Sequence, residues 1–250
     1  MQNLTASLSE IFSSVQGEGK YVGYRQLFVR FVGCNLVCGY CDTKEPTAVP
    51  CCQVETAAGS LHFKAEANPL TSERAAALIN SLLRETPHQA VSFTGGEPLL
   101  QADFLRELIP RLTAKIFLET NGTLPEALAK IIGGVDIISM DIKLPGDTGK
   151  ELWERHEAFL RLAGAAQKDV YVKLVISQGH PLADYHRAID LVAQISPQTP
   201  LVLQPVTPIP HGNYAPPSPR ELMALMDYAD GHLADVRLIP QTHKMLQGML

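Results

Sequence analysis

The stretch "GCNLVCGYCDT", residues 33–43, holds three cysteines, Cys34, Cys38 and Cys41, in the spacing C-x3-C-x2-C. Structural zinc sites and most iron–sulfur sites use four protein ligands, so a set of three leaves one metal position open. Three thiolates can hold three irons of a [4Fe–4S] cluster, and an open metal position is typical of a site that reacts. The alternative is a zinc site whose fourth ligand is a histidine, Cys51 or Cys52.

The chain around this loop alternates short apolar runs with helical patterns, and one apolar run, residues 25–33, precedes the cysteines. Continuous apolar runs between helices are typical of parallel strands that are buried on both faces. About seven strands are too few for a closed eight-stranded barrel. The fold class that we predict is therefore α/β, a partial, open β/α barrel of about six to seven parallel strands. The later predicted strands are residues 90–93, 115–119, 135–142, 170–176, 200–204 and 235–239, and the predicted helices are residues 72–85, 102–113, 151–163 and 183–195.

Residues 44–69 interrupt this alternation, because they contain turn residues and little clear period. We predict an insertion after the cysteine loop, with a short hairpin around residues 60–66. Cys51 and Cys52 fall in this insertion, and we interpret them as buried or bystander thiols rather than cluster ligands. The whole chain, residues 1–250, is predicted to form one domain, because its length and its 46% hydrophobic content suit a single large core.

The composition argues against several kinds of partner. The 250 residues carry a net charge of −5, and no block of lysine and arginine marks a surface for nucleic acid or for a membrane of anionic lipid. The first residues lack the basic and apolar regions of a signal peptide, and no run reaches membrane-spanning length. All five cysteines lie between positions 34 and 52, which suits metal binding in a reducing compartment. We therefore expect a cytoplasmic protein.

Polar or glycine-rich motifs follow several predicted strands. They are "TGGEP" at residues 94–98, "ETNG" at 119–122, "DIK" at 141–143 and "QP" at 204–205. In parallel α/β folds the carboxyl ends of the strands meet at one mouth, where ligands bind. We expect these motifs and the cysteine loop to surround one site, although Asn121-Gly122 alone could be only a turn.

Two of these motifs resemble the signatures of the radical S-adenosylmethionine superfamily: "CNLVCGYC" (34–41) and "TGGEP" (94–98), in this order. The resemblance implies a [4Fe–4S] cluster on Cys34, Cys38 and Cys41, with S-adenosylmethionine on the open iron as the source of a 5′-deoxyadenosyl radical. It also implies that the backbone and the carboxylate of "GGE" hold the methionine amino group. The residues expected to contact S-adenosylmethionine are Tyr40, Gly95, Gly96, Glu97 and Ser139.

Four stretches are similar to the 7-carboxy-7-deazaguanine synthase family: "SSVQGEGKYVG" (13–23), "RFVGCNLVCGYCDT" (30–43), "ETNG" (119–122) and "PQTHKML" (240–246). The resemblance implies a lyase of queuosine and 7-deazapurine biosynthesis, which converts 6-carboxy-5,6,7,8-tetrahydropterin to 7-carboxy-7-deazaguanine with ring contraction and loss of ammonia. S-adenosylmethionine would be regenerated, and Mg²⁺ would assist. The resemblance also implies a homodimer that receives electrons from a donor such as flavodoxin or ferredoxin.

The same resemblance implies roles for individual residues. Glu18 would bind the donor-rich edge of the pterin, and Arg30 would form a bidentate ion pair with the substrate carboxylate. Thr43 resembles the family's protein ligand to Mg²⁺, an ion usually held by few protein oxygens together with substrate and water. The expected substrate-binding residues are Gln16, Glu18, Arg30, Thr94, Glu119, Lys173, Gln204 and His243.

Several of these assignments have structural alternatives. Glu18 and Arg30 could form a salt bridge with each other, and Thr43 could cap a helix. Lys143 could be a solvated charge at a strand end, and His243 could be an exposed histidine. Two other functions also share part of the pattern: a glycyl-radical enzyme activase, which acts on a protein, and an iron–sulfur or zinc protein without catalysis.

Overall fold

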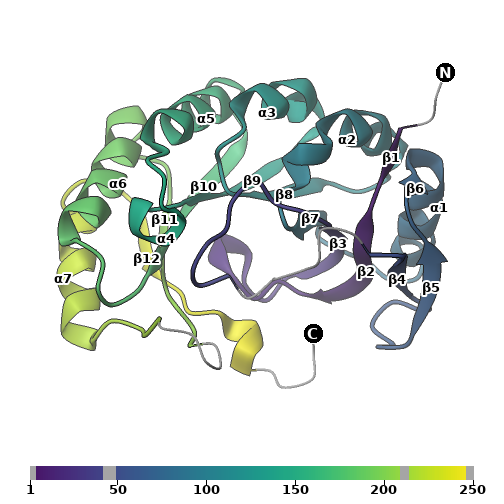
Figure 1. The fold of residues 1–250 in the computed structure, drawn as a ribbon, viewed down its shortest axis with the longest axis horizontal. Helices are drawn as coiled ribbons and strands as arrows, with labels where there is room; N and C mark the ends of the chain where they lie inside the picture. The colour runs from purple at the N-terminus through teal and green to yellow at the C-terminus, as the bar shows by residue number, and fades with distance from the viewer. Residues whose placement is uncertain (1–3, 42–48, 209–213, 246–250) are drawn as a thin grey trace.

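The computed structural model describes residues 4–41, 49–208 and 214–245. Within these residues a curved ten-stranded sheet forms the centre of the fold, and an arc of helices covers its outer face (Figure 1). The strands of this sheet are β2 (Leu8–Val15), β3 (Arg25–Phe31), β4 (Cys51–Glu55), β5 (Phe63–Ala67), β7 (Val91–Gly95), β8 (Ile116–Thr120), β9 (Ile137–Ile142), β10 (Asp169–Ile176), β11 (Leu201–Pro205) and β12 (Val236–Leu238). Their order is β12-β11-β10-β9-β8-β7-β3-β2-β4-β5, so the sheet is open, with β12 and β5 at its edges.

Seven neighbouring strands of the described sheet, from β12 across to β3, run parallel. This arrangement confirms the predicted open α/β barrel. The strands read as apolar runs because both of their faces are buried. On β10, for example, Val172 and Leu174 pack in the core under the helices, while Tyr171 belongs to a separate cluster on the other face.

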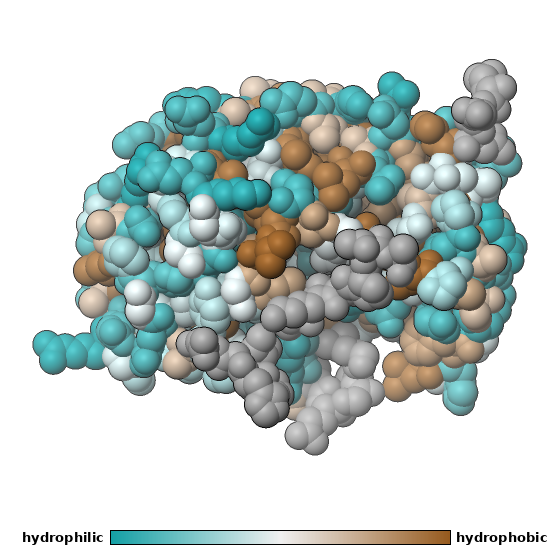
Figure 2. Space-filling view, viewed as in Figure 1, coloured by the Kyte–Doolittle hydropathy of each residue, from teal (hydrophilic) through white to brown (hydrophobic). Residues whose placement is uncertain are grey.

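Helices connect the parallel strands and cover the convex face of the sheet (Figure 1). Figure 2 shows mostly hydrophilic residues over this outer arc, with hydrophobic residues grouped between the helices and the sheet. None of the helices in the described part of the chain combines the length and the hydrophobicity needed to cross a lipid bilayer. The helices are α1 (Ser72–Leu83), α2 (Ala102–Leu108), α3 (Pro125–Ile131), α4 (Pro145–Thr148), α5 (Trp153–Ala165), α6 (Leu182–Ile195) and α7 (Pro219–Asp230), with short 3-10 helices η1 (Gly19–Tyr21), η2 (Pro98–Gln101), η3 (Ile109–Arg111), η4 (Ile132–Gly134) and η5 (Thr242–Met245).

The four predicted helices are confirmed, with ends within a few residues of those of α1, α2 with η3, α5 and α6. Helices α3, α4 and α7 are absent from the sequence prediction. For α7 a signal exists: Ser218 and Glu221 form a capping box, in which each side chain accepts a hydrogen bond from the backbone N–H of the other. The pattern Ser-x-x-Glu with proline at the first helical position therefore marks where this helix begins.

Strands β2, β4 and β5 extend the sheet beyond the parallel strands. β2 pairs antiparallel with β3 and parallel with β4, and β4 forms an antiparallel hairpin with β5, which confirms the hairpin predicted around residues 60–66. β2 is absent from the sequence prediction, because "LSEIFSSV" mixes serine and glutamate with its apolar residues. Cys51 and Cys52 begin β4, and a short pair of strands, β1 (Thr5–Ala6) and β6 (Leu70–Thr71), lies outside the main sheet.

The concave face of the parallel strands carries two layers of side chains. Near the amino ends of the strands, a small apolar cluster contains Phe117, Ile137, Tyr171 and Val202. Side chains alternate between the two faces of a strand, so positions two residues further along face the same side. These positions are Glu119, Ser139, Lys173 and Gln204. The apolar layer therefore lies below a polar layer that faces the mouth of the open barrel.

His156 on α5 is a polar residue in the apolar core. It is 0% exposed, and both of its ring nitrogens lack a hydrogen-bond partner in the part of the chain that the structure describes. Burial lowers the pKa of His156 to about 4, the charge of Lys143 also lowers it, and Asp141 opposes the shift. The unfolded chain binds this proton near pH 6.5, so the stability that neutral His156 contributes is present above pH 6.5 and is lost as the pH falls towards 4.

We expect the His156→Leu variant to lose this pH dependence. Between about pH 7 and about pH 5 the free energy of unfolding of the wild type should fall by roughly 2 kcal/mol more than that of the variant. Urea unfolding of the metal-free protein at the two pH values measures the difference. His62→Leu, on the exposed turn of the β4–β5 hairpin, is the control. Equal pH dependence in the wild type and in His156→Leu would contradict the expectation.

Candidate functional site

Polar side chains from neighbouring strands meet near the carboxyl ends of the parallel strands, as the motifs predict. Strand alternation places them all on the concave face. They are Arg30 on β3, Thr94 on β7, Glu119 on β8, Asp141 on β9, Lys173 on β10 and Gln204 on β11. All except Asp141 are among the predicted substrate-binding residues.

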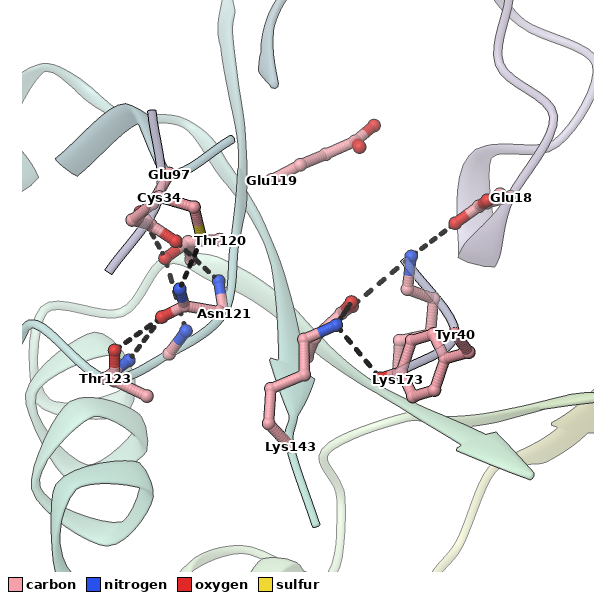
Figure 3. A network of polar contacts seen from close by, with 12 residues as sticks. Glu18, Cys34, Tyr40, Glu97, Glu119, Thr120, Asn121, Thr123, Lys143 and Lys173 are labelled. Atoms are coloured by element: carbon pink, nitrogen blue, oxygen red, sulfur yellow. Dashed lines mark hydrogen bonds and ion pairs between the residues drawn. The ribbon is translucent and has the colours of Figure 1, made fainter. Parts of the chain in front are cut away.

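Glu18 lies between β2 and η1, and its carboxylate binds partners from distant parts of the chain. Lys173 forms an ion pair with one oxygen (Figure 3), and Gln241 Nε2 donates to the other at 2.6 Å. Burial alone would raise the pKa of Glu18, but the ammonium group of Lys173 and the hydrogen bond from Gln241 lower it to about 2. Glu18 is therefore an ionised carboxylate at neutral pH, and the alternative of a salt bridge between Glu18 and Arg30 is wrong.

The "QTHK" stretch, residues 241–244, folds back onto the "QGEG" stretch, residues 16–19. The backbone N–H and the hydroxyl of Thr242 donate to the Gly17 carbonyl oxygen at 2.9 and 3.0 Å. His243 packs so closely against Gly17 that a Cβ added there would lie 2.4 Å from His243 Nδ1. The charge of His243 also contributes to the low pKa of Glu18. His243 is half-buried beside Glu18, so the alternative of an exposed histidine is wrong.

Glu119 is the second carboxylate of this region. Gln16 Nε2 donates to Glu119 Oε1 at 2.7 Å, and the Thr94 hydroxyl donates to Oε2 at 2.9 Å. Gln16 also accepts a hydrogen bond from the backbone N–H of Glu18 through its Oε1. Burial raises the pKa of Glu119, Lys173 lowers it, and Glu18 raises it. The structure thus brings five predicted substrate-binding residues, Gln16, Glu18, Thr94, Glu119 and Lys173, into one bonded network.

Asp141 connects this network to the cysteine loop. Its Oδ1 lies 3.3 Å from Lys173 Nζ, and its Oδ2 lies 2.8 Å from Lys143 Nζ. Lys143 in turn donates to the Tyr40 hydroxyl at 3.2 Å (Figure 3). The Lys143 side chain is only 11% exposed, so the alternative of a solvated charge is wrong. Asp141 is absent from the predicted set, although its place in "DIK" at a strand end is a usable signal.

The three cysteines lie in the loop after β3, at the same mouth. All three thiols are free, and two nitrogen donors approach the Cys34 sulfur: the Leu36 N–H at 3.5 Å and Asn121 Nδ2 at 3.8 Å. Asn121 is therefore more than a turn residue. Hydrogen bonds to the sulfurs are a usual feature of iron–sulfur sites. Burial raises the pKa of Cys38 to about 11, and a bound metal would reverse this shift by stabilising the thiolate.

The donor set fits a cluster of the predicted type. Among residues 4–41, 49–208 and 214–245, no three histidine, cysteine, aspartate or glutamate side chains converge closely enough to hold one metal ion. A [4Fe–4S] cluster does not require such convergence, because each thiolate binds a different iron. Three thiols on one loop, with nitrogen donors directed at one of them, therefore suit the cluster.

Glu97 supports the cysteine loop through its carboxylate. The side chain is fully buried and accepts hydrogen bonds from the Asn121 N–H at 2.8 Å, the Thr120 hydroxyl at 2.9 Å and the Leu99 N–H at 3.0 Å. Burial raises the pKa of Glu97 to about 7, against these hydrogen bonds, which lower it. The expectation that this carboxylate holds the methionine group of S-adenosylmethionine stays a prediction. In the structure the carboxylate is buried and accepts a hydrogen bond from Asn121, which contacts Cys34.

Gly95 ends β7 and lies against Phe31 of β3, and Gly96 follows it and lies against Gly33, at the start of the cysteine loop. The Gly96 N–H donates to the Phe31 carbonyl at 2.9 Å, and the Glu97 N–H donates to the Gly33 carbonyl at 2.8 Å. A Cβ on Gly96 would lie 1.9 Å from the Gly33 oxygen, and Gly95 has a φ of +108°, which favours glycine. Both glycines are therefore required for the close approach of "TGGEP" to the residue before Cys34.

We expect Gly96→Ala to displace Gly33 and to destabilise the metal-free protein by about 3 kcal/mol, because a backbone atom cannot move aside cheaply. Thermal unfolding measures the stability, and iron content after reconstitution reports on the loop. The matched control is Gly164→Ala in α5, where an added Cβ meets no atom within 4 Å of the described chain. If both variants unfold at the wild-type temperature, the close contact is not needed.

Four predicted residues remain, and they lie apart from the contacts described above. Arg30 Nε donates to Glu10 at 2.9 Å, and its guanidinium lies 5.4 Å from the centre of the Phe12 ring. Gln204 is buried, and its Oε1 lacks a hydrogen-bond partner among the described residues. A buried acceptor of this kind usually has a partner, so a donor group of a ligand is a candidate. The remaining two are Ser139 and Thr43. Ser139 belongs to the polar layer, and its hydroxyl binds Tyr171 of the apolar layer, whereas Thr43 lies outside the described residues.

Comparison with known proteins identifies similar sequences over nearly the whole chain. The family model described as the radical SAM superfamily matches residues 28–192. A 7-carboxy-7-deazaguanine synthase of Geobacter sulfurreducens is 41% identical over 246 residues, which cover 96% of this chain and 97% of that protein. The protein of the same name from Methanocaldococcus jannaschii is 37% identical over 256 residues and covers 97% of this chain and 100% of its own.

Solved structures share the fold at lower identity. QueE from Escherichia coli superposes with a TM-score of 0.60 at 20% identity, covering 96% of this chain and 95% of that chain. The structure titled native anSMEcpe with bound AdoMet gives a TM-score of 0.53 at 17% identity, over 82% of this chain and 60% of that chain. At these identities the likeness concerns the fold alone.

Proposed function

This chain belongs to the 7-carboxy-7-deazaguanine synthase family of radical SAM enzymes, and we propose that it converts 6-carboxy-5,6,7,8-tetrahydropterin to 7-carboxy-7-deazaguanine, with ring contraction and loss of ammonia. The single observation that carries the proposal is the bonded network of Gln16, Glu18, Thr94, Glu119 and Lys173. These residues come from four separate segments, the "QGEG" stretch and strands β7, β8 and β10, and meet beside the cysteine loop.

The cofactors follow from the donor set and from the family. Cys34, Cys38 and Cys41 would hold a [4Fe–4S] cluster, and the backbone of Gly95 and Gly96 together with Tyr40 would border S-adenosylmethionine. When bound, the two cofactors supply a 5′-deoxyadenosyl radical that takes a hydrogen atom from the substrate. Mg²⁺, with Thr43 as its protein ligand, belongs to the proposal as well. So do an electron donor such as flavodoxin or ferredoxin and a homodimeric state.

The chain's own residues would bind and orient the pterin. Glu18 stays ionised at neutral pH, because its pKa is about 2, so it accepts hydrogen bonds from the N–H groups of the pterin edge. Gln16 holds the loop that carries Glu18 by accepting from its backbone N–H at 3.0 Å. Glu119, whose pKa burial raises, offers a second acceptor on the same face.

The substrate carboxylate would bind Arg30 at the other side of the mouth. The Arg30 side chain is 27% exposed and is held by Glu10 through Nε, so its two terminal nitrogens would supply the donors for the substrate carboxylate. Gln204 and His243 would complete the pocket. A buried acceptor on Gln204 is satisfied once an N–H of the substrate approaches it.

One anaerobic assay tests the proposal. The cluster is reconstituted and reduced, S-adenosylmethionine, Mg²⁺ and 6-carboxy-5,6,7,8-tetrahydropterin are added, and mass spectrometry follows 7-carboxy-7-deazaguanine. We expect many turnovers with little 5′-deoxyadenosine. Accumulation of 5′-deoxyadenosine without that product would support the proposed cluster chemistry and contradict the proposed substrate. A requirement for a protein substrate would point to a glycyl-radical activase, and no cleavage of S-adenosylmethionine would point to a protein without catalysis.

A further inference from the structure

The turn between Cys38 and Cys41 contacts a part of the chain that carries no predicted site residue. The Gly39 N–H donates to the Asp147 carbonyl oxygen at 3.0 Å, and the turn itself closes through a hydrogen bond from Cys41 N–H to the Cys38 oxygen at 3.2 Å. Asp147 belongs to α4, which follows β9. The loop that would hold the cluster therefore rests on α4.

The Asp147 side chain joins two further loops to α4 at this point. Its carboxylate is only 1% exposed, and its Oδ1 lies 2.7 Å from His180 Nε2, in the loop after β10. The hydroxyl of Tyr214, in the loop after β11, also binds this carboxylate. The two loops are tied together as well, because the Gln178 N–H donates to the Ala215 oxygen at 2.9 Å.

Tyr214 packs closely against the cysteine loop, and His180 packs closely against α4. A Cβ on Gly39 would lie 2.1 Å from the Tyr214 hydroxyl oxygen, and a Cβ on Gly146 would lie 2.4 Å from His180 Nδ1. The Tyr214 ring also meets the Tyr40 ring edge to face, with centroids 5.8 Å apart. Buried, hydrogen-bonded polar groups of this kind specify one arrangement, because each partner left unpaired is costly.

We propose that Asp147, His180 and Tyr214 are positioning residues that fix the Cys38–Cys41 turn, and the proposal rests on the cluster assigned above to the three cysteines. The two halves of the cysteine loop are thus held by different means. Asn121 and the Leu36 N–H approach the first cysteine, whereas Asp147, His180 and Tyr214 fix the turn that carries the other two. Substitution of a residue that orients a metal ligand commonly lowers the metal affinity by about 10- to 100-fold.

Tyr214→Phe is the first test, because it removes the hydroxyl and keeps the ring. The matched control is Tyr228→Phe on α7, which removes a tyrosine hydroxyl that donates to Asp190 at 2.9 Å on the outer helices. We expect the reconstituted Tyr214→Phe protein to release iron to a chelator about tenfold faster than the control. Its reduced cluster should also give a changed electron paramagnetic resonance spectrum, while the metal-free variant unfolds at the wild-type temperature.

A double-mutant cycle tests the contact itself. Gly39→Ala alone should sharply lower the iron content after reconstitution, because its Cβ meets the Tyr214 hydroxyl. In the Tyr214→Ala background, Gly39→Ala should lower the iron content little further, since no tyrosine ring then occupies the space. Additive losses would overturn the proposal, and so would a Tyr214→Phe spectrum and iron release equal to those of Tyr228→Phe. A wild-type protein that takes up no iron would overturn the proposed cluster and this inference together.

Discussion

Replacing Cys38 with alanine is expected to abolish the cleavage of S-adenosylmethionine, with a loss of more than about a hundredfold. The same result is expected for Cys34→Ala and Cys41→Ala. A cluster held by two thiolates is labile, and the two other cysteines, Cys51 and Cys52, lie in β4 and not in the cysteine loop. Cleavage is measured as 5′-deoxyadenosine formed by the reconstituted, reduced protein, and iron per chain is measured in the same samples.

Cys51→Ala is the matched control. Cys51 begins β4 and pairs with Ala67 across the hairpin. Its thiol is partly exposed, and the variant should keep both its iron content and its cleavage activity. Loss of cleavage in Cys51→Ala with retention in Cys41→Ala would show that the wrong thiols have been assigned to the cluster.

Glu18→Gln is expected to weaken pterin binding by about 10- to 100-fold, because a hydrogen bond to a charged group contributes about 1.5–3 kcal/mol. The substitution keeps the size of the side chain and its contact with Gln241. Lys173 keeps the Asp141 carboxylate at 3.3 Å, so its charge is not left without a partner. Binding of S-adenosylmethionine should therefore persist, and isothermal titration of the reconstituted protein with each ligand separates the two effects.

The control for this variant is Glu126→Gln on α3, which removes a carboxylate from an exposed ion pair with Arg155. An exposed pair contributes little, so both affinities should stay at the wild-type level. A parallel fall in the affinities for pterin and S-adenosylmethionine in Glu18→Gln would mean that Glu18 supports the fold of the mouth instead of binding the substrate.

The parallel strands could be predicted from the sequence because burial on both faces leaves an apolar run. The single lysine in "VYVKLVI" (170–176) is informative for the same reason, since a charge in a buried strand requires a partner. Its partners could not be predicted from local pattern. Glu18 lies 155 residues before Lys173, and Asp141 becomes its neighbour only through the pairing of β9 with β10.

Other parts of the site depend on elements whose sequences carry a weak pattern. Arg30 is predicted to bind a carboxylate, but the partner that holds it, Glu10, lies on β2, a strand that has no apolar run. Of the residues that hold the cysteine loop, Asp147 lies in the four-residue helix α4, and His180 and Tyr214 lie in connections between strands and helices. Irregular loops have no period that could indicate which of them will meet.

The contact of Gln241 with Glu18 has a consequence for how the protein matures on the ribosome. The two residues are 223 positions apart, so a nascent chain that ends before residue 241 cannot form this contact. The cysteine loop and most of the strands that surround it are synthesised earlier, and chains commonly begin to fold from the amino-terminal part during synthesis. Competence to receive iron should therefore arise before competence to bind the pterin. A chain arrested before residue 241 is therefore expected to bind the cluster but not the pterin.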